Sequence, residues 1–358
     1  MNKKDKVAIP LIAVGLGILI GIIILLLSGK NVFALFSALI KGFSGIDLIK
    51  GNLTPNLRYP GEFLVSAMPI ILTGLAIGFA YRTGLFNIGA EGQVIMGSLV
   101  ACSVGILIPM PPFVGVVVCV MLAGLGGAVW GVIPGFLKVK CNISEVVTGI
   151  MLNYTALYSA NYFLRALPNS DPQRTADIPV SATLYSETLS ALTNNSRLHY
   201  GIIIVVIALI VYWFIIEKTS FGYSLRATGF NLEAAKYAGI KVRSRVIYSM
   251  MISGFLAGLA GGIVVLGTFG YGRIMSAMDN YGFDGIAVAL VGGCNAIGIL
   301  FSGLLFALLN VTQTLLQVSG IPKEIGDIIS SSIVFFVAIQ YAIIFILNKY
   351  RNKQKEVK

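Results

Sequence analysis

The sequence predicts an all-α polytopic membrane protein with about ten transmembrane helices, some of them short or broken. Of its 358 residues, 56% are hydrophobic and only 11% are charged, whereas soluble domains carry about 25% charged residues. Apolar runs such as 9–27, 201–216 and 328–347 are about long enough to cross a hydrocarbon core of ~30 Å as helices. We therefore expect a single transmembrane domain over residues 1–358.

The first apolar run, 9–27, follows a basic start like that of a signal peptide. Its apolar core is too long for a signal peptide and no A-x-A-like cleavage site follows directly, so we expect an uncleaved first span. The mixed segment 28–60 is expected at the outer interface. The other predicted spans are 62–81, 92–108, 113–137, 144–164, 201–216, 246–269, 283–293, 297–318 and 326–347. The total is ten only if the short run 283–293 crosses the membrane.

Basic residues gather at places that the positive-inside rule assigns to the cytoplasm. These places are 3–6, 138–140, 218–245 and 349–358. The net charge of +11 is therefore a topology signal, and no pattern typical of nucleic-acid binding accompanies it. We expect cytoplasmic termini at 1–8 and 348–358, an external loop at 165–200 with a short helix near its end, and a cytoplasmic loop at 217–245.

The sequence holds few groups for catalysis. Its single histidine, His199, lies at the outer edge of a predicted span, which argues against a His-based metal site or a Ser–His couple within one chain. Neither the H-E-x-x-H motif nor the G-x-x-x-x-G-K-[ST] phosphate loop occurs. We expect no catalytic residue, no metal site and no ATPase site in this chain.

Glycine is abundant, with 41 residues, many of them inside predicted spans. Small residues on one helix let a neighbouring backbone approach closely. Two interpretations stay open: the glycines serve close packing alone, or some of them permit helix breaks or sliding between two states.

Acidic residues interrupt the spans at two glycine-rich places, FNIGAEGQ (86–93) and GFDGIAVALVGG (282–293). A carboxylate at the bilayer centre costs about 2.5–3.5 kcal/mol, so Glu91 and Asp284 should be paired, near an interface or beside water. Glycine permits a turn at membrane depth, where irregular backbone is tolerated only if protein or water satisfies it. The two places are either corresponding pieces of two repeated halves or independent helix starts with acidic caps.

A short helix is predicted within the stretch RATGFNLEAAKYAGIKVRSRV (226–246). Asn231 is a suitable N-cap, Glu233 lies in the first turn beside the helix dipole, and Gly239 is placed to end the helix. One face is shared by Leu232, Ala235 and Ala238. A helix of this length is not stable alone, so this face is expected to fit a groove on a partner; the alternative is a plain amphipathic loop.

The chain resembles the ABC-importer permeases that handle ribose-type sugars, branched-chain amino acids and nucleosides. The EAA-type cytoplasmic loop of such permeases, which docks into the ATPase subunit, resembles GFNLEAAKYAGI (229–240). Three further segments carry the resemblance: YRTGLFNIGAEGQVIMGSL (81–99), SEVVTGIMLNY (144–154) and GFDGIAVALVGGCNAIG (282–298). The segment FNIGAEGQ (86–93) is similar to the corresponding segment of the nucleoside branch of this family. The chain departs from many relatives at Asn295-Ala296, where they read Asn-Pro.

The resemblance implies a permease subunit in the plasma membrane of a bacterium that translocates a nucleoside delivered by a lipoprotein binding protein. It implies separate ATPase subunits that use ATP and Mg, no cofactor in this chain, and a second, different permease in a heterodimer. The implied coupling residues are Gly229, Asn231, Leu232, Glu233, Ala234, Ala235, Ala238 and Gly239. The implied substrate pathway draws on Asn87, Glu91, Gln93, Asn153, Phe283 and Asp284, each of which either contacts substrate or shapes the backbone.

Three other functions compete with this one. The same family also imports simple sugars and other small polar solutes. An ion-coupled secondary carrier would use Glu91 or Asp284 as its coupling site and would need no ATPase. An intramembrane enzyme finds the least support, because the sequence has one histidine and no paired catalytic motif.

Overall fold

The computed structural model describes residues 3–49, 51, 54–318, 320–322 and 324–339, with side chains of the first helix described from Ile12. This part of the chain is built mainly from helices, with one two-stranded sheet among the described residues. The predicted all-α fold is confirmed. The tail at 348–358 and the end of the last predicted span lie outside the described residues.

The helices follow the predicted spans closely, with added elements in the loops. The first half contains α1 (Lys3–Leu27), α2 (Val32–Ser44), α3 (Arg58–Tyr81), α4 (Ala90–Leu107), α5 (Val114–Cys141), α6 (Glu145–Arg165), β1 (Arg174–Asp177), η1 (Val180–Ala182) and α7 (Glu187–Leu192). The second half contains α8 (Gly201–Lys218), α9 (Ser220–Phe230), α10 (Leu232–Tyr237), α11 (Val242–Ile263), η2 (Val264–Phe269), β2 (Tyr271–Arg273), α12 (Tyr281–Val291), α13 (Ala296–Val318) and α14 (Glu324–Ala338).

Six helices of the described part are long and apolar enough to cross a membrane: α3, α4, α5, α8, α11 continued by η2, and α13. The other predicted spans are helical as well, but α12 and the described apolar part of α1 are shorter. Helix α6 is long but carries more polar residues. The number of ten spans therefore stays a prediction.

Helix α3 forms the centre of the molecule. Its most apolar window is 89% buried, and it packs against α11, α12 and α13. Leu72, Leu75 and Phe79 are fully buried on it. Because α3 is apolar on all sides, it is a core helix rather than a lipid-facing one.

Glycines bring α5 and α11 into close contact. A Cβ on Gly127 would overlap the Gly254 carbonyl oxygen, and a Cβ on Gly131 would lie 2.5 Å from the Met250 carbonyl oxygen. The two backbones therefore touch where any side chain would keep them apart. Close packing, the first of the two predicted roles, holds at these positions.

The segment 270–280, here called the strap, joins the end of α11 and η2 to α12. It begins at Gly270, in the left-handed conformation, and β2 within it pairs antiparallel with β1. The strap reaches the middle of α3, where the hydroxyl of Thr73 donates to the carbonyl of Tyr281 at 2.9 Å. Helix α12 has 11 residues and is therefore about 16 Å long, roughly half of a 30 Å hydrocarbon core.

Helix α12 ends against the far end of α3 and α8. The Tyr212 hydroxyl of α8 donates to the Cys294 carbonyl at 2.9 Å. Gly293 and Cys294 both have positive φ, and Asn295 accepts from the Gly298 N–H at 2.8 Å. The turn thus forms with alanine at position 296.

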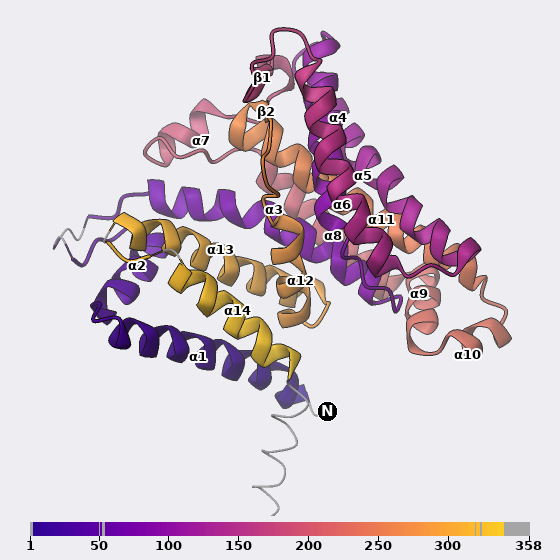
Figure 1. Ribbon diagram of the computed structural model, residues 1–358, viewed down its shortest axis with the longest axis horizontal. Coiled ribbons are helices and arrows are strands. Elements are labelled where there is room, and N and C mark those ends of the chain that lie inside the picture. Colours follow the sequence, from indigo (N-terminus) through magenta and orange to yellow (C-terminus); the bar gives the residue numbers. More distant parts are fainter. Residues whose placement is uncertain (1–2, 50, 52–53, 319, 323, 340–358) are drawn as a thin grey trace, which may run out of the picture.

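The loop elements lie at two opposite ends of the molecule (Figure 1). One end carries α7 and the sheet of β1 and β2, and the other carries α9 and α10. Ser186 caps α7 by accepting from the Leu189 N–H, which confirms the helix predicted in the loop 165–200. Helix α9 was not predicted; Thr219 caps it by accepting from the Gly222 N–H at 3.0 Å, and Leu225 is fully buried on it.

Candidate functional site

Glu91 caps α12 from another helix. It lies in the first turn of α4 and is 1% exposed. Its two carboxylate oxygens accept from the backbone N–H groups of Asn280, at 3.0 Å, and Gly282, at 2.6 Å. A carboxylate at a helix N-terminus satisfies free N–H groups and interacts favourably with the helix dipole. Glu91 therefore fixes the start of α12 at membrane depth.

Asn87 and Gln93 bind each other across the turn before α4. The Asn87 amide donates to the Gln93 carbonyl oxygen at 2.8 Å and to the Ser253 hydroxyl at 2.7 Å. Ser253 in turn donates to the Ala76 carbonyl of α3 at 2.6 Å. Asn87 and Gln93 are each 1% exposed, so this network joins the turn to α3 and α11 inside the protein.

Asn153 of α6 holds the same turn from the other side. Its side-chain oxygen accepts from the Gly92 N–H at 2.8 Å, and its amide donates to the Ile88 carbonyl at 3.0 Å. Asn153 is 1% exposed. It therefore satisfies backbone groups that the break between α3 and α4 leaves free.

The two predicted residues on α12 have different surroundings. Asp284 accepts from the Asn310 amide of α13 at 3.2 Å, whereas the Phe283 side chain is 39% exposed. The structure thus joins Asn87, Gln93 and Asn153 around one turn and Glu91 to the start of α12. It does not bring all six predicted pathway residues into one cavity.

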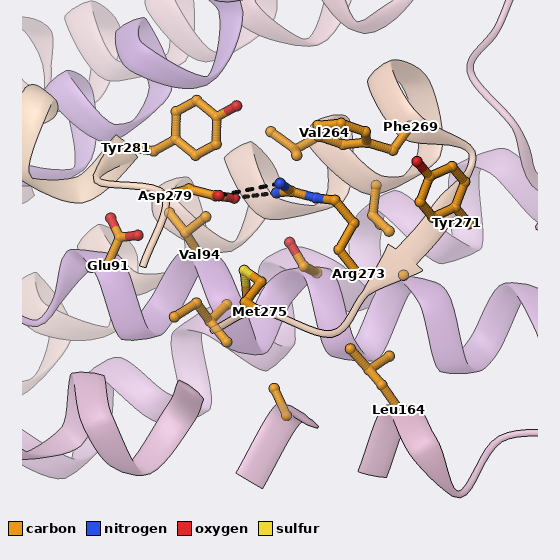
Figure 2. A pocket seen from close by; sticks show the side chains of 15 residues that line it. Glu91, Val94, Leu164, Val264, Phe269, Tyr271, Arg273, Met275, Asp279 and Tyr281 are labelled. Carbon is orange, nitrogen blue, oxygen red and sulfur yellow. Dashed lines mark hydrogen bonds and ion pairs between the residues drawn. The ribbon is translucent and has the colours of Figure 1, made fainter. Parts of the chain in front are cut away.

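A cavity lies between α4, α6, η2 and the strap, and Glu91 lines it (Figure 2). Arg273 of the strap forms an ion pair with Asp279 across the cavity, and its guanidinium lies 3.9 Å from the centroid of the Phe269 ring. Tyr281 lines the same cavity near Glu91. Opposite charges are thus paired where the strap folds into the membrane domain.

Sequence reasoning missed the residues that hold the strap. Asn161 of α6 binds the backbone of Met275 twice, accepting from its N–H at 2.9 Å and donating to its carbonyl at 2.7 Å. Thr175 accepts from the Gly272 N–H at 2.9 Å. The available signal was that Asn161 is a second amide, eight residues after Asn153, within the same predicted span.

The predicted short helix is present as α10. Asn231 caps it by accepting from the Ala234 N–H at 3.0 Å, and Gly239 follows its end with φ of 79°. The Glu233 side chain is 68% exposed. Of the predicted face, Leu232 and Ala238 are exposed, whereas Ala235 is 3% exposed, and α10 packs against α9 and α11 of its own chain.

Aromatic residues flank α10 instead. Phe230 is 90% exposed and Tyr237 is 92% exposed. These are large apolar side chains at the end of the molecule that carries α9 and α10 (Figure 1), and exposed aromatic residues are typical anchors of protein interfaces.

Helix α9 connects this surface to the break. Glu217 at the end of α8 pairs with both Arg82, just beyond α3, and Arg226 on α9. Gly229 packs against the backbone of Arg82 and Gly84, so that a Cβ there would lie 2.5 Å from the Arg82 carbonyl oxygen. The turn that leads to Glu91 is therefore in direct contact with the helix that precedes α10.

The described residues contain no group of three or more His, Cys, Asp or Glu side chains that could hold a metal ion. The buried acidic groups of the site instead bind backbone N–H groups, as at Glu91, or an amide, as at Asp284.

Comparison with known proteins identifies the family. The family model described as "Branched-chain amino acid transport system / permease component" matches residues 59–346. The chain is 42% identical to the guanosine ABC transporter permease protein NupP of Bacillus subtilis over 99% of both chains. It is 37% identical to the nucleoside ABC transporter permease protein NupB of Lactococcus lactis, over 97% of this chain and 95% of that one.

A further relative is the guanosine ABC transporter permease protein NupQ of Bacillus subtilis, at 27% identity over 68% of this chain and 77% of that one. No solved structure gives a significant match. The family match at residues 59–346 covers almost all of α3 and the helices from α4 to α14, and with them the break at Glu91 and the α10 surface. The chain therefore belongs to the family of branched-chain amino acid transport system permease components and is a multi-pass ABC importer permease.

Proposed function

We propose that this permease translocates a nucleoside. The observation that carries the proposal is the similarity to NupP and NupB over almost the whole chain, since these proteins are named as guanosine and nucleoside permeases. The shared length includes the break at 86–93 and α12, so the similarity extends to the segments expected to form the pathway.

Separate ATPase subunits, which use ATP and Mg, supply the energy and dock on α10. This assignment rests on the exposed Glu233 and the exposed aromatic residues Phe230 and Tyr237, and on the absence of a phosphate-loop motif from the sequence. No cofactor is held by this chain. The α9–α10 end is then cytoplasmic, and so are both termini.

Movement at α10 reaches the pathway through a chain of contacts. ATPase closure shifts α10 and α9; α9 contacts the turn after α3 through Gly229 and through the pairing of Arg226 and Arg82 with Glu217. That turn leads into α4, where Glu91 accepts from the Gly282 N–H and so fixes the start of α12. A shift at the ATPase is thereby transmitted to a half-length helix at membrane depth.

Asn87, Glu91, Gln93 and Asn153 shape the break and do not contact the substrate in this proposal. Their hydrogen bonds go to backbone groups, to one another or to the Ser253 hydroxyl, and each is 1% exposed. Phe283, which is 39% exposed, is the predicted pathway residue best placed to contact substrate.

The partners follow the same reasoning. Because Bacillus subtilis has two proteins named as guanosine permeases, NupP and NupQ, we place this chain in a heterodimer with a second, different permease. A lipoprotein binding protein delivers the substrate at the end formed by α7, β1 and β2. The assembly lies in the plasma membrane of a bacterium.

The docking assignment is tested by purifying the tagged chain with its neighbours in mild detergent. Helices α7 and α10 both have six residues with an acidic residue in the first turn, which provides a matched control. Glu233→Lys should remove the ATPase from the purified assembly and abolish uptake, while Glu187→Lys should keep the ATPase in the assembly. If Glu233→Lys retains the ATPase and parental uptake, the docking assignment is wrong.

The substrate is tested by uptake of radiolabelled guanosine, cytidine and ribose into cells that express the full assembly. Nucleoside uptake that persists when the ion gradient is collapsed, as long as ATP remains, supports an ATP-driven nucleoside importer. Uptake of ribose alone would assign the chain to sugar import, and uptake that stops with the gradient would identify an ion-coupled carrier.

A further inference from the structure

Helix α6 presents an unusual exposed face. Tyr154, Tyr158 and Tyr162, spaced four residues apart, are 55%, 69% and 72% exposed. Residues four apart share one face of a helix, so these side chains form a stripe, here called the tyrosine stripe. It rises about 12 Å along the helix.

The central exposed residues of α5 and α8 are aliphatic, in contrast, and the exposed aromatic residues of these two helices, Phe136, Trp213 and Phe214, lie toward the helix ends. Helix α8 exposes Ile203, Val206, Ile207 and Ile210, and α5 exposes Val117, Met121, Leu125 and Val129. Such faces suit lipid. The tyrosine stripe differs in chemistry from every one of these residues, which indicates that α6 faces another environment.

An interfacial position does not explain the stripe. Tyrosine is enriched where headgroups meet the hydrocarbon core, and this accounts for Tyr162 near the end of α6. Tyr154, however, lies nine residues from the first and eleven from the last residue of α6, or about 14 and 16 Å from the two ends. Tyr154 therefore lies near the middle of α6 and of the predicted span 144–164.

The hydroxyls of Tyr154 and Tyr158 have no hydrogen-bond partner among the described residues, unlike the buried Tyr212, which donates to Cys294. A hydroxyl placed in an apolar environment without a partner is costly. These two hydroxyls therefore need water or a polar group from outside this chain.

Helix α6 also contacts the moving parts of the site. Asn161, on the same helix between Tyr158 and Tyr162, holds Met275 of the strap. Ala160 and Leu164 line the cavity with Glu91 and Tyr281 (Figure 2). Ala160 and Leu164 are buried on the opposite side of α6 from the stripe, and Asn161 ties the helix to the segment that the proposed mechanism moves.

We propose that the tyrosine stripe lines the aqueous translocation pathway and that Tyr154 and Tyr158 contact the base of the nucleoside. Aromatic side chains stack on every base through the π-face, and this tolerates different bases, while a hydroxyl binds the polar edge of the base. The substrate class rests on the proposed function; the aqueous environment of the stripe does not.

Thiol labelling of the full assembly in membranes tests the environment. The native Cys102, Cys119 and Cys294 are buried and Cys141 is exposed, so the background is Cys141→Ser. In it, Tyr158→Cys is compared with Ile207→Cys on the aliphatic face of α8. Since the thiolate is the reacting form, a charged, membrane-impermeant methanethiosulfonate should label position 158 and leave position 207 unlabelled. Equal, low labelling of both positions places the stripe against lipid or the second permease and overturns the proposal.

Contact with the base is tested by protection: guanosine should slow the labelling of position 158, whereas ribose should leave its labelling rate unchanged. In uptake, Tyr158→Leu, which removes the ring and the hydroxyl, should raise KM about tenfold, while Tyr158→Phe, which keeps the ring and loses only the hydroxyl, should raise KM less, by about threefold. Labelling without protection by guanosine, or equal KM values for Leu and Phe variants, overturns the contact with the base. If no nucleoside is transported by the parent, the proposed function fails, and the labelling result still decides whether the stripe faces water.

Discussion

The Glu91 carboxylate accepts from the Gly282 N–H at 2.6 Å, so one helix of this permease is capped by a residue 191 positions away. In soluble proteins a cap is usually supplied within the first turn. Here α12 begins inside the membrane domain, and Asn280, which precedes it, makes no side-chain cap. Glu91 takes that role from α4.

Removal of the cap should destabilise the protein. Glu91→Ala leaves two backbone N–H groups without a partner, and we expect a loss of about 3–6 kcal/mol, since hydrogen bonds to charged groups contribute about 1.5–3 kcal/mol each. Glu91→Gln keeps one acceptor and should lose about half as much. The thermal unfolding midpoint of purified protein measures both, with Glu187→Gln as control. Equal midpoints for Glu91→Ala and the control would contradict the capping role.

Asn153 should tolerate no acidic replacement. Asn153→Asp keeps the acceptor for the Gly92 N–H but places a carboxylate oxygen against the Ile88 carbonyl, where the amide now donates at 3.0 Å. We expect a loss of about 1–3 kcal/mol and lower uptake. Asn169→Asp, at an exposed loop position, is the control. A midpoint for Asn153→Asp that matches the control would show that the clamp is dispensable.

Tyr237 should contribute to docking without contributing to folding. Its side chain is 92% exposed, so Tyr237→Ala should leave the unfolding midpoint within about 1 °C, since exposed substitutions change stability by less than about 0.5 kcal/mol. The amount of co-purified ATPase should fall at least about fivefold, as truncation of an aromatic interface anchor costs more than about 1 kcal/mol. Tyr185→Ala, an exposed tyrosine on the opposite end, should change neither quantity, and full ATPase retention by Tyr237→Ala would remove this residue from the interface.

Gly229 should be irreplaceable by alanine. A methyl group there would lie 2.5 Å from the Arg82 carbonyl oxygen and would push α9 away from the turn before Glu91. Gly229→Ala should therefore lower uptake more than it lowers ATPase retention. Gly15→Ala, where a Cβ meets nothing within 4 Å, is the control. Uptake by Gly229→Ala at the level of Gly15→Ala would exclude this contact from the coupling route.

His199 should make the external end sensitive to acid. His199 is fully buried, and its Nδ1 accepts from the Gly201 N–H at 3.1 Å. Burial, together with the positive charge of Arg197, lowers the pKa of His199 to about 4, whereas the negative charge of Glu62 acts to raise this pKa. In the unfolded chain His199 binds a proton with a pKa near 6.5. The contribution of His199 to the free energy of unfolding is therefore fully present above pH 6.5, and the free energy of unfolding falls by about 3 kcal/mol as the pH drops to 4.

Because His199 is the sole histidine of the chain, one substitution separates its effect on the pH dependence of stability from the effects of the other titratable groups. The unfolding midpoint of the parent should fall between pH 7 and pH 5 by more than that of His199→Gln, because glutamine does not titrate. Parallel curves for the two proteins would mean that His199 takes up no proton on unfolding in this range.

Much of the architecture followed from local patterns. The spans near α3, α5 and α8 were predicted because apolar runs of that length have one stable form in a bilayer. The cap of α10 by Asn231 was predicted because an N-cap acts within three residues. Helix α9 was missed, since its support is the burial of Leu225, a tertiary contact that the polar composition of the loop does not indicate.

Hydropathy, capping and sequence motifs are properties of neighbouring residues, and they were enough to predict the membrane class, the family and the positions of the break and the α10 surface. The folded structure was needed to show what Glu91, Asn153 and Asn161 bind, since their partners are 61 to 191 positions away. It also decided that Ala235 faces its own chain and that the tyrosines of α6 face outward. A helical period shows which residues share a face, and the packing of the other helices determines what that face meets.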